Sequence, residues 1–196
     1  MAYTDGGYKP AEDPANEKAG FGWSAHRNPT GPSTSVGEMV EYGFGPVTVN
    51  PADRQYVGVD SLSANSAEVS AMSQLLLRVL QWKERGDTLT NLAICYDSNY
   101  AASWGSTDDM LDTHVEAGIL LQGLRRAVEQ EGVNVHFIKV KGHMDDHKGF
   151  IDKFRCAKGN RLADDYASKG MKEETTQMPY KMQELPLHIS GETTTR

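Results

Sequence analysis

Residues 92–97 are Leu-Ala-Ile-Cys-Tyr-Asp, a short and almost entirely apolar run that ends in a carboxylate. A run of this length and composition predicts a strand buried on both faces, as in the parallel part of an α/β sheet. Segments with apolar residues at helical spacing flank it over residues 66–85 and 110–131, and Gly86 and Gly132 end them. A buried strand between two such helices predicts a sheet that helices cover.

The remaining patterns lie on both sides of this run. Only four residues precede Asp5, which ends the first strand, so this strand is predicted to be short. Residues 160–169 predict a last helix. Alternating or β-branched runs predict the other strands, over residues 20–26, 39–49, 54–59 and 133–140. Strands first, and then strands that alternate with helices, indicate a mixed α/β sheet.

Length and composition favour a single intracellular domain. The 196 residues suffice for one domain with a proper core, over residues 1–170, and the polar residues 171–196 are predicted to form a flexible tail. No apolar run approaches the roughly 20 residues that cross a bilayer, and the N-terminus lacks a signal-peptide pattern. The two cysteines, Cys95 and Cys156, give neither a disulfide framework nor a zinc site, which favours the cytoplasm or nucleus.

Four carboxylates lie at particular places in this pattern. Asp5 closes the first strand, Glu68 lies in the first turn of the 66–85 helix, Asp97 ends the buried strand and Asp164 lies in the last helix. Each also has a structural interpretation: a turn residue, a helix N-terminal charge, a helix cap, or half of a solvated Asp164–Asp165 pair. Their order and flanking residues favour a common site, because open α/β sheets place functional groups at strand ends and helix starts.

Five motifs carry a resemblance to a known family. They are Tyr-Thr-Asp-Gly-Gly (3–7), Asn-Ser-Ala-Glu (65–68), Tyr-Asp-Ser-Asn-Tyr (96–100), Val-Lys-Gly-His (140–143) and Gly-Asn-Arg-Leu-Ala-Asp-Asp-Tyr-Ala (159–167). In this order they resemble the type 1 ribonuclease H family. The resemblance implies the ribonuclease H-like fold, a mixed five-stranded sheet flanked by helices, with a catalytic domain over residues 1–170. It also implies an endonuclease that hydrolyses the RNA strand of RNA–DNA hybrids and leaves 5′-phosphate and 3′-hydroxyl ends.

The resemblance further implies that Asp5, Glu68, Asp97 and Asp164 converge on two Mg²⁺ ions, for which Mn²⁺ can substitute. Phosphodiester hydrolysis needs an activated water and stabilised charge on the attacking and leaving oxygens, and two divalent ions about 4 Å apart supply both. Mg²⁺ prefers oxygen ligands, and clustered acids repel one another without it, which raises their pKa values. His143 is implied to be a proton shuttle that assists product departure, although a lone histidine after a strand also has a structural interpretation.

Substrate contacts are expected mostly at the nucleic-acid backbone. The net charge of −7 argues weakly against a nucleic-acid partner, but residues 139–161 form a net positive window. The loop from His143 to Asn160 is longer than usual in the family, and we hypothesise that it clamps the hybrid. The expected contact residues are Gly6, Asn65, Ser98 and Asn99 at the minor groove, and Lys148, Lys153, Arg155 and Lys158 in the clamp. No protein partner is implied, and we expect a monomer.

Departures from the family pattern leave alternatives open. Ala64 stands where many relatives have a second Asn, and the short first strand means either that the true start lies upstream or that the chain was cut from a longer protein. A DNA-directed nuclease of the same superfamily is one alternative, although exonucleases of that kind usually carry a second acid where this chain has Gly7. The other alternative is an inactive hybrid-binding module whose carboxylates no longer hold metal.

Overall fold

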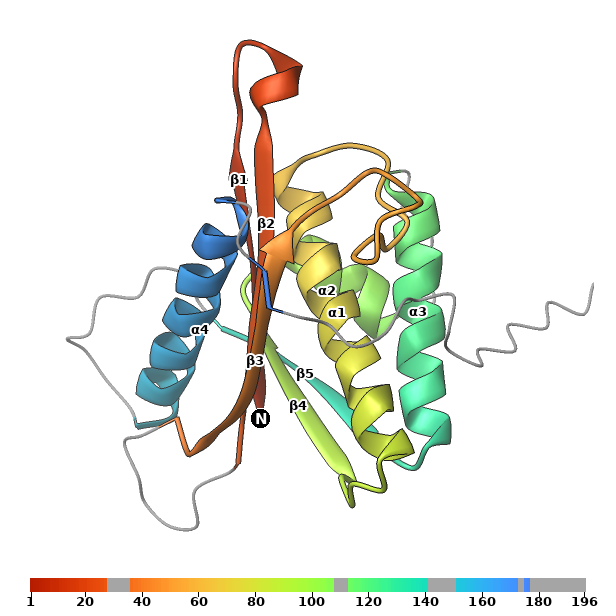
Figure 1. Ribbon diagram of the computed structural model, residues 1–196. Helices are drawn as coiled ribbons and strands as arrows, with labels where there is room; N and C mark the ends of the chain where they lie inside the picture. The colour runs from red at the N-terminus through yellow and green to blue at the C-terminus, as the bar shows by residue number, and fades with distance from the viewer. Residues whose placement is uncertain (28–35, 108–112, 141–150, 173–174, 177–196) are drawn as a thin grey trace, which may run out of the picture.

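The computed structural model describes residues 1–27, 36–107, 113–140, 151–172 and 175–176 (Figure 1). Helix α4 covers one face of a single sheet, and helices α1, α2 and α3 lie on the other face. The elements in chain order are β1 (Ala2–Lys9), the 3₁₀ turn η1 (Pro14–Asn16), β2 (Lys18–His26), β3 (Met39–Pro46), α1 (Ala64–Glu84), β4 (Asn91–Tyr96), α2 (Asn99–Ser106), α3 (Val115–Gln130), β5 (Asn134–Lys139) and α4 (Ile151–Gly170). None of the helices in these ranges is both long and apolar enough to cross a bilayer.

The sheet has five strands in the order β3-β2-β1-β4-β5. Strand β2 runs antiparallel to its neighbours β1 and β3, and β4 runs parallel to its neighbours β1 and β5. The prediction of a mixed five-stranded sheet flanked by helices is therefore confirmed. Strand β1 pairs with β4 only through Ala2 opposite Ile94 and Tyr3 opposite Cys95. Beyond those residues the two central strands part.

Helix α1 is the centre of the core, between the sheet and α3. It begins after Ser63, whose hydroxyl accepts from the Ser66 backbone N–H at 2.9 Å, while the Ser66 hydroxyl accepts from the Ser63 N–H at 2.8 Å. This reciprocal cap satisfies two backbone donors that the first turn leaves without helical partners. The helix then buries side chains on nearly all its faces, including Met72 and Leu76, which are 0 % exposed. Its start is therefore held at a fixed place beside β1.

Two glycines in the central strands allow helices to approach the sheet closely. A Cβ atom at Gly6 would lie 2.4 Å from the backbone nitrogen of Glu68 in α1, and one at Gly22 would lie 2.3 Å from the backbone oxygen of Ala163 in α4. Distances below 3 Å to backbone atoms leave no room for a side chain. Gly22 lies directly opposite Asp5 in the β1–β2 ladder, so α4 packs closely against the sheet beside Asp5.

Strand β1 is longer than the sequence predicts. The prediction that Asp5 closes the first strand is wrong, because β1 has eight residues and Asp5 lies inside it. Gly6 and Gly7 continue the strand opposite Phe21 and Gly20 of β2. Pairing with β2 therefore outweighs the turn preference of a Gly-Gly pair, as tertiary context often overrides local propensity.

The helix predicted over residues 110–131 is present as α3, which begins at Val115, and the sequence pattern did not predict the separate helix α2 that precedes it. Helix α2 follows Asp97 almost directly, and its sequence Asn-Tyr-Ala-Ala-Ser-Trp-Gly-Ser is too short and too rich in small residues to show apolar periodicity. Its Trp104 is nevertheless fully buried. The sequence pattern thus missed a helix whose place is set by one large side chain.

One further predicted strand is absent, and the predicted start of the last helix is wrong. Residues 54–59 form turns and extended loop rather than a strand, although Val57 and Val59 are buried as the pattern indicated. Helix α4 begins at Ile151 instead of residue 160, so only part of the predicted long loop is loop. Charged residues dominate the first half of α4 and hide its helical spacing.

The chain after α4 returns to the edge of the sheet. The backbone N–H of Thr176 donates to the carbonyl of Phe44 in β3 at 3.0 Å. Residues 177–196 lie outside the described part of the chain, so the flexible tail remains a prediction.

We predict that Gly22→Ala lowers the free energy of unfolding by about 1–3 kcal/mol, the usual cost of forcing a methyl group into a packed layer. The added methyl must push α4 away from β2, because the atoms it meets are backbone. Urea unfolding followed by circular dichroism measures the loss. Lys9→Ala, at the exposed end of β1, is the control and should change little; a Gly22→Ala variant as stable as the wild type would show that α4 can move without cost.

Candidate functional site

The site lies where β1 and β4 part. The register that pairs Tyr3 with Cys95 brings Asp5 and Asp97 opposite one another two residues further on, where the strands no longer share hydrogen bonds. Asp5 lies directly opposite Gly22, and residues that are opposite one another in an antiparallel pair have side chains on the same face. The carboxylate of Asp5 therefore lies on the α4 face of β1, beside the gap between the strands.

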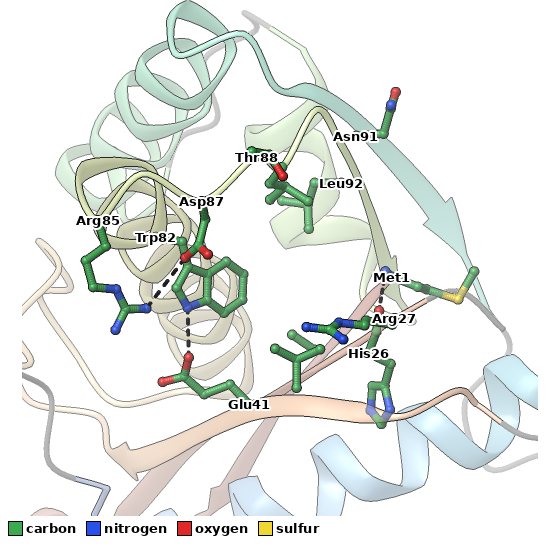
Figure 2. A pocket seen from close by; sticks show the side chains of 13 residues that line it. Met1, His26, Arg27, Glu41, Trp82, Arg85, Asp87, Thr88, Asn91 and Leu92 are labelled. Atoms are coloured by element: carbon green, nitrogen blue, oxygen red, sulfur yellow. Dashed lines mark hydrogen bonds and ion pairs between the residues drawn. The ribbon is translucent and has the colours of Figure 1, made fainter.

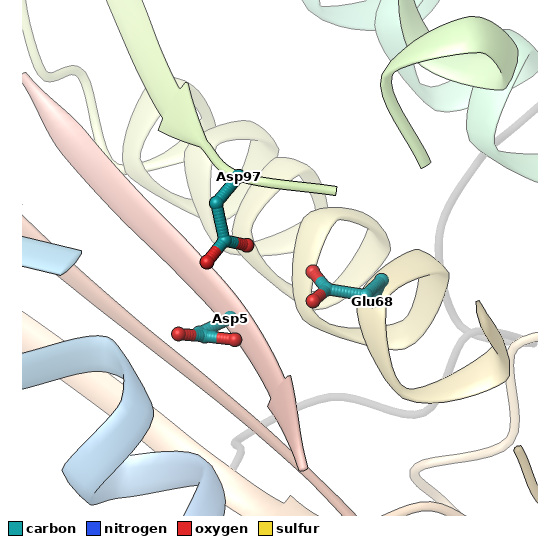
Figure 3. Close-up of side chains that lie close together, drawn as sticks. All are labelled: Asp5, Glu68 and Asp97. Carbon is teal, nitrogen blue, oxygen red and sulfur yellow. The ribbon is translucent and has the colours of Figure 1, made fainter. Parts of the chain in front are cut away.

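Glu68 reaches the same gap from the α1 side of the sheet. It lies in the second turn of α1, not in the first turn as predicted, so the helix dipole does not account for it. One carboxylate oxygen from each of Asp5, Glu68 and Asp97 lies within 4.8 Å of the other two. Figure 3 shows the three side chains close together. Asp5 and Glu68 are each only 8 % exposed. The structure thus assembles three of the four predicted carboxylates from three different elements.

Helix α4 adds a carboxylate and an amide from the other side. Asp164 is half-buried, and its charge contributes to raising the pKa of Asp5, although it does not belong to the group of three within 4.8 Å. Asp165, the next residue, is exposed. The side-chain amide of Asn160 donates to Asp5 Oδ2 at 3.3 Å and to Asp97 Oδ2 at 3.2 Å.

Sequence reasoning missed Asn160, although a signal was present. Residues four apart on a helix lie on the same face, so Asn160 had to share the face of Asp164. An amide is less distinctive than an acid, so the carboxylate of the Gly-Asn-Arg-Leu-Ala-Asp motif is the part that indicates a metal site.

Burial and neighbouring acids raise the pKa values of Asp5 and Glu68. Burial, and then the charges of Asp97 and Asp164, raise the pKa of Asp5 to about 7, even though the Gly6 backbone N–H donates to its Oδ1 at 2.8 Å. Burial, and then Asp5 and Asp97, raise the pKa of Glu68 well above its ordinary value. Near pH 7 the site therefore holds either protons or a cation.

The donor set fits a hard divalent cation. All three clustered side chains offer carboxylate oxygens, which Mg²⁺ prefers, and no sulfur or imidazole ligand belongs to this group among the described residues. In addition, Asn160 is 6 % exposed, and its Oδ1 has no hydrogen-bond partner in the described part of the chain. A buried acceptor without a donor beside three acids is a further place for positive charge.

The residues predicted at the minor groove lie near this cluster in the chain. Asn65 in the first turn of α1 and Asn99 at the start of α2 are exposed, and Ser98 precedes α2 without capping it through its side chain. Gly6 has a second explanation, since its missing side chain is what lets α1 approach β1.

The structure describes only part of the predicted clamp, and the predicted proton shuttle lies outside the described residues. Lys158 is exposed on α4. The side chains of Lys153 and Arg155, in the same helix, lie outside the described part of the structure. His143 and Lys148 lie outside the described residues altogether, so their roles remain predictions.

A separate hollow of about 570 Å³ lies at the other end of the sheet, between the C-terminal end of α1 and the strands β2, β3 and β4 (Figure 2). Several of its polar groups interact with one another. The Trp82 indole N–H donates to Glu41 Oε2 at 2.8 Å, and Arg85 Nη2 lies 3.9 Å from Asp87 Oδ2. None of the three clustered carboxylates lines this hollow. We therefore assign the functional site to the carboxylate cluster.

Solved structures match this fold, whereas no protein-family model and no curated protein sequence matches the chain. RNase H1 from the halophilic archaeon Halobacterium salinarum superposes with a TM-score of 0.53 and 15% identity, over 88% of this chain and 97% of that one. The N-terminal RNase H domain of a Mycobacterium tuberculosis protein gives 0.51 and 13%, over 87% and 93%. An RNase H1 isolated from compost by a metagenomic approach gives 0.53 and 17%, over 87% and 94%. At these identities the likeness establishes the fold, and the expected ribonuclease H-like fold is confirmed.

The raised pKa of Asp5 predicts how stability without metal depends on pH. A carboxyl whose folded-state pKa lies above its unfolded value of 3.8 adds stability that is complete below that value and is lost as the pH rises through about 7. Asp5→Asn removes this dependence. The wild type loses this contribution as the pH rises from 5 to 8, and the variant does not. Over this range the difference in unfolding free energy between variant and wild type should therefore shift in favour of the variant by on the order of 2 kcal/mol.

Urea unfolding in the presence of chelator, at both pH values, measures this difference. Asp165→Asn is the matched control, because Asp165 is exposed and should leave the pH dependence unchanged. If the stability of Asp5→Asn and that of the wild type changed with pH in parallel, this result would contradict the raised pKa of Asp5.

Proposed function

We propose that this chain is an endonuclease of the type 1 ribonuclease H family that hydrolyses the RNA strand of RNA–DNA hybrids with divalent metal ions. One observation carries the proposal: carboxylate oxygens of Asp5, Glu68 and Asp97 lie within 4.8 Å of one another at the parting of two parallel strands. The fold that presents them is shared with solved RNase H structures. The motifs around these acids support the same conclusion, because each acid lies in a stretch that resembles the family.

Asp5, Glu68, Asp97 and Asp164 would hold two Mg²⁺ ions, with Mn²⁺ as a substitute. When bound, the ions supply an attacking water of lowered pKa and positive charge on the phosphate oxygens. Metal ligands must be deprotonated, so protons compete for Asp5 at and below its pKa of about 7. The fold therefore keeps these acids close at a cost in stability, which bound cations would relieve.

The other residues of the site would bind and orient the hybrid. Asn65, Ser98 and Asn99 offer short polar side chains that can reach 2′-hydroxyls and phosphate oxygens without reading bases. His143 would give a proton to the departing 3′ oxygen. Attack by water with loss of that oxygen leaves a 5′-phosphate and a 3′-hydroxyl.

The alternatives are less well supported. An inactive hybrid-binding module has no need to keep two buried acids beside a third, since their repulsion destabilises the fold. Exonucleases of this superfamily usually carry a second acid at the place where this chain has Gly7.

The decisive experiment is cleavage of a labelled hybrid with Mg²⁺, beside single-stranded RNA, double-stranded RNA and double-stranded DNA. We expect cutting of the hybrid alone, with 5′-phosphate ends, and none with chelator. Asp5→Asn, Glu68→Gln and Asp97→Asn should each reduce turnover by more than about 100-fold. Replacing a residue that only hydrogen-bonds to a metal ligand costs up to about 100-fold, so the loss of a ligand itself should cost more.

Asp165→Asn is the control for these variants and should retain nearly full activity, because Asp165 points away from the cluster by about 100° of helix rotation. Undiminished cutting in excess chelator would exclude the metal mechanism. Cutting of double-stranded DNA in preference to the hybrid would favour the DNA-directed alternative.

The clamp is tested by salt dependence. Replacing Lys148, Lys153, Arg155 and Lys158 together by Ala should weaken hybrid binding and flatten its salt dependence, by up to about 0.9 in slope for each duplex phosphate that these cations no longer neutralise. Binding is measured with Ca²⁺ in place of Mg²⁺, and turnover at saturating hybrid should fall less. The control replaces the cations near the first hairpin, Lys9, Lys18 and Arg27. If only the control flattens the slope, the clamp lies at that hairpin.

A further inference from the structure

Asn160 is buried among acids in an unusual way. Its side-chain nitrogen lies 3.3 Å from Asp5 Oδ2 and 3.2 Å from Asp97 Oδ2, so the amide gives one N–H to each carboxylate. Both hydrogens of the amide group are then used. A neutral group thus bridges two like charges and takes the place that a cation would have between them.

The other end of the same amide has no partner. Asn160 Oδ1 is buried and accepts no hydrogen bond in the described part of the structure, although the side chain is 6 % exposed. Buried acceptors are normally paired, and an unpaired one calls for an explanation. A group that enters the cluster with positive charge can supply the missing partner.

A hard cation would be such a partner. Amide oxygens are ligands of Mg²⁺ and Ca²⁺ alongside carboxylates. Rotation of the amide about its last side-chain bond exchanges nitrogen and oxygen, and this bond has a broad, roughly two-fold preference, so the exchange is sterically accessible. The same side chain can therefore present N–H groups to acids alone or an oxygen to acids with a cation.

We propose that Asn160 responds to metal: it bridges Asp5 and Asp97 through its nitrogen when no cation is bound, and it turns its oxygen toward the cation when one is bound. The inference rests on the proposed function only in requiring that the cluster bind a divalent cation. It makes Asn160 a positioning residue that keeps the acids together before metal arrives and then contributes to holding the metal.

Asn160→Leu tests this, because it keeps the branched shape of the side chain and removes both polar atoms. Without nucleic acid, calorimetric titration with Mn²⁺ should show affinity lowered by about tenfold, which corresponds to ~1.4 kcal/mol. Without metal, the variant should also unfold at lower urea. Asp165→Asn, on the same helix and away from the cluster, controls for the general effect of charge on affinity.

The opposite result separates a ligand from a mere spacer. If the amide only bridges the acids, its removal frees their oxygens, and the Mn²⁺ affinity of Asn160→Leu stays the same or rises; that outcome overturns the proposal. If wild-type protein binds Mn²⁺ and cleaves hybrid while Asn160→Leu binds equally well, the proposed function stands and this inference alone fails. If wild-type protein binds no divalent cation, both fail.

A second measurement needs no variant. In nuclear magnetic resonance spectra of the wild type, the side-chain NH₂ signals of Asn160 should move upfield and exchange faster with water as Mg²⁺ is added, because the amide gives up two hydrogen bonds to carboxylates. Signals that stay in place at saturating Mg²⁺ would mean that the bridge persists, and would overturn the proposal even if Asn160→Leu does not fold.

Discussion

The repulsion among buried carboxylates is the constraint around which this molecule is arranged. Carboxylate oxygens of Asp5, Glu68 and Asp97 lie within 4.8 Å of one another, and Asp5 and Glu68 are each only 8 % exposed, so burial and the neighbouring acids raise the pKa values of these two residues. Burying charge is costly unless it is paired or binds metal. The Gly6 backbone N–H and the Asn160 amide offset part of that cost by donating to the same carboxylates. A fold that keeps such a cluster has a use for it beyond stability.

The sequence predicted the members of this cluster better than the structure around them. The acids could be found because each lies in a motif with a fixed order, although only Asp97 lies directly after a strand as the pattern predicted. The length of β1 could not be found, because Gly6-Gly7 resembles a turn until its pairing with β2 is known. Helix α2 escaped for a related reason: its position depends on burying Trp104 against neighbours that are distant in sequence.

Asn160 shows where local sequence reasoning reaches its end. Its spacing from Asp164 predicts a shared helix face, but its contact with Asp5 joins residues 155 positions apart. In the response to metal proposed above, the atom of the amide that faces the acids depends on whether a cation is bound. No pattern within α4 carries that information.

The two faces of the sheet contribute different chemistry, and the glycines explain how both reach one point. Gly6 admits α1 on one face and Gly22 admits α4 on the other, each where a side chain would collide with helix backbone. Glu68 therefore comes from one face, and Asn160 comes from the other. They can meet only where the sheet itself is open, and β1 and β4 part just beyond Tyr3 and Cys95. Close helix packing and the early parting of β1 and β4 are therefore both needed to bring these groups to one place. If the two strands stayed paired past this point, the sheet would separate the groups that the helices bring together.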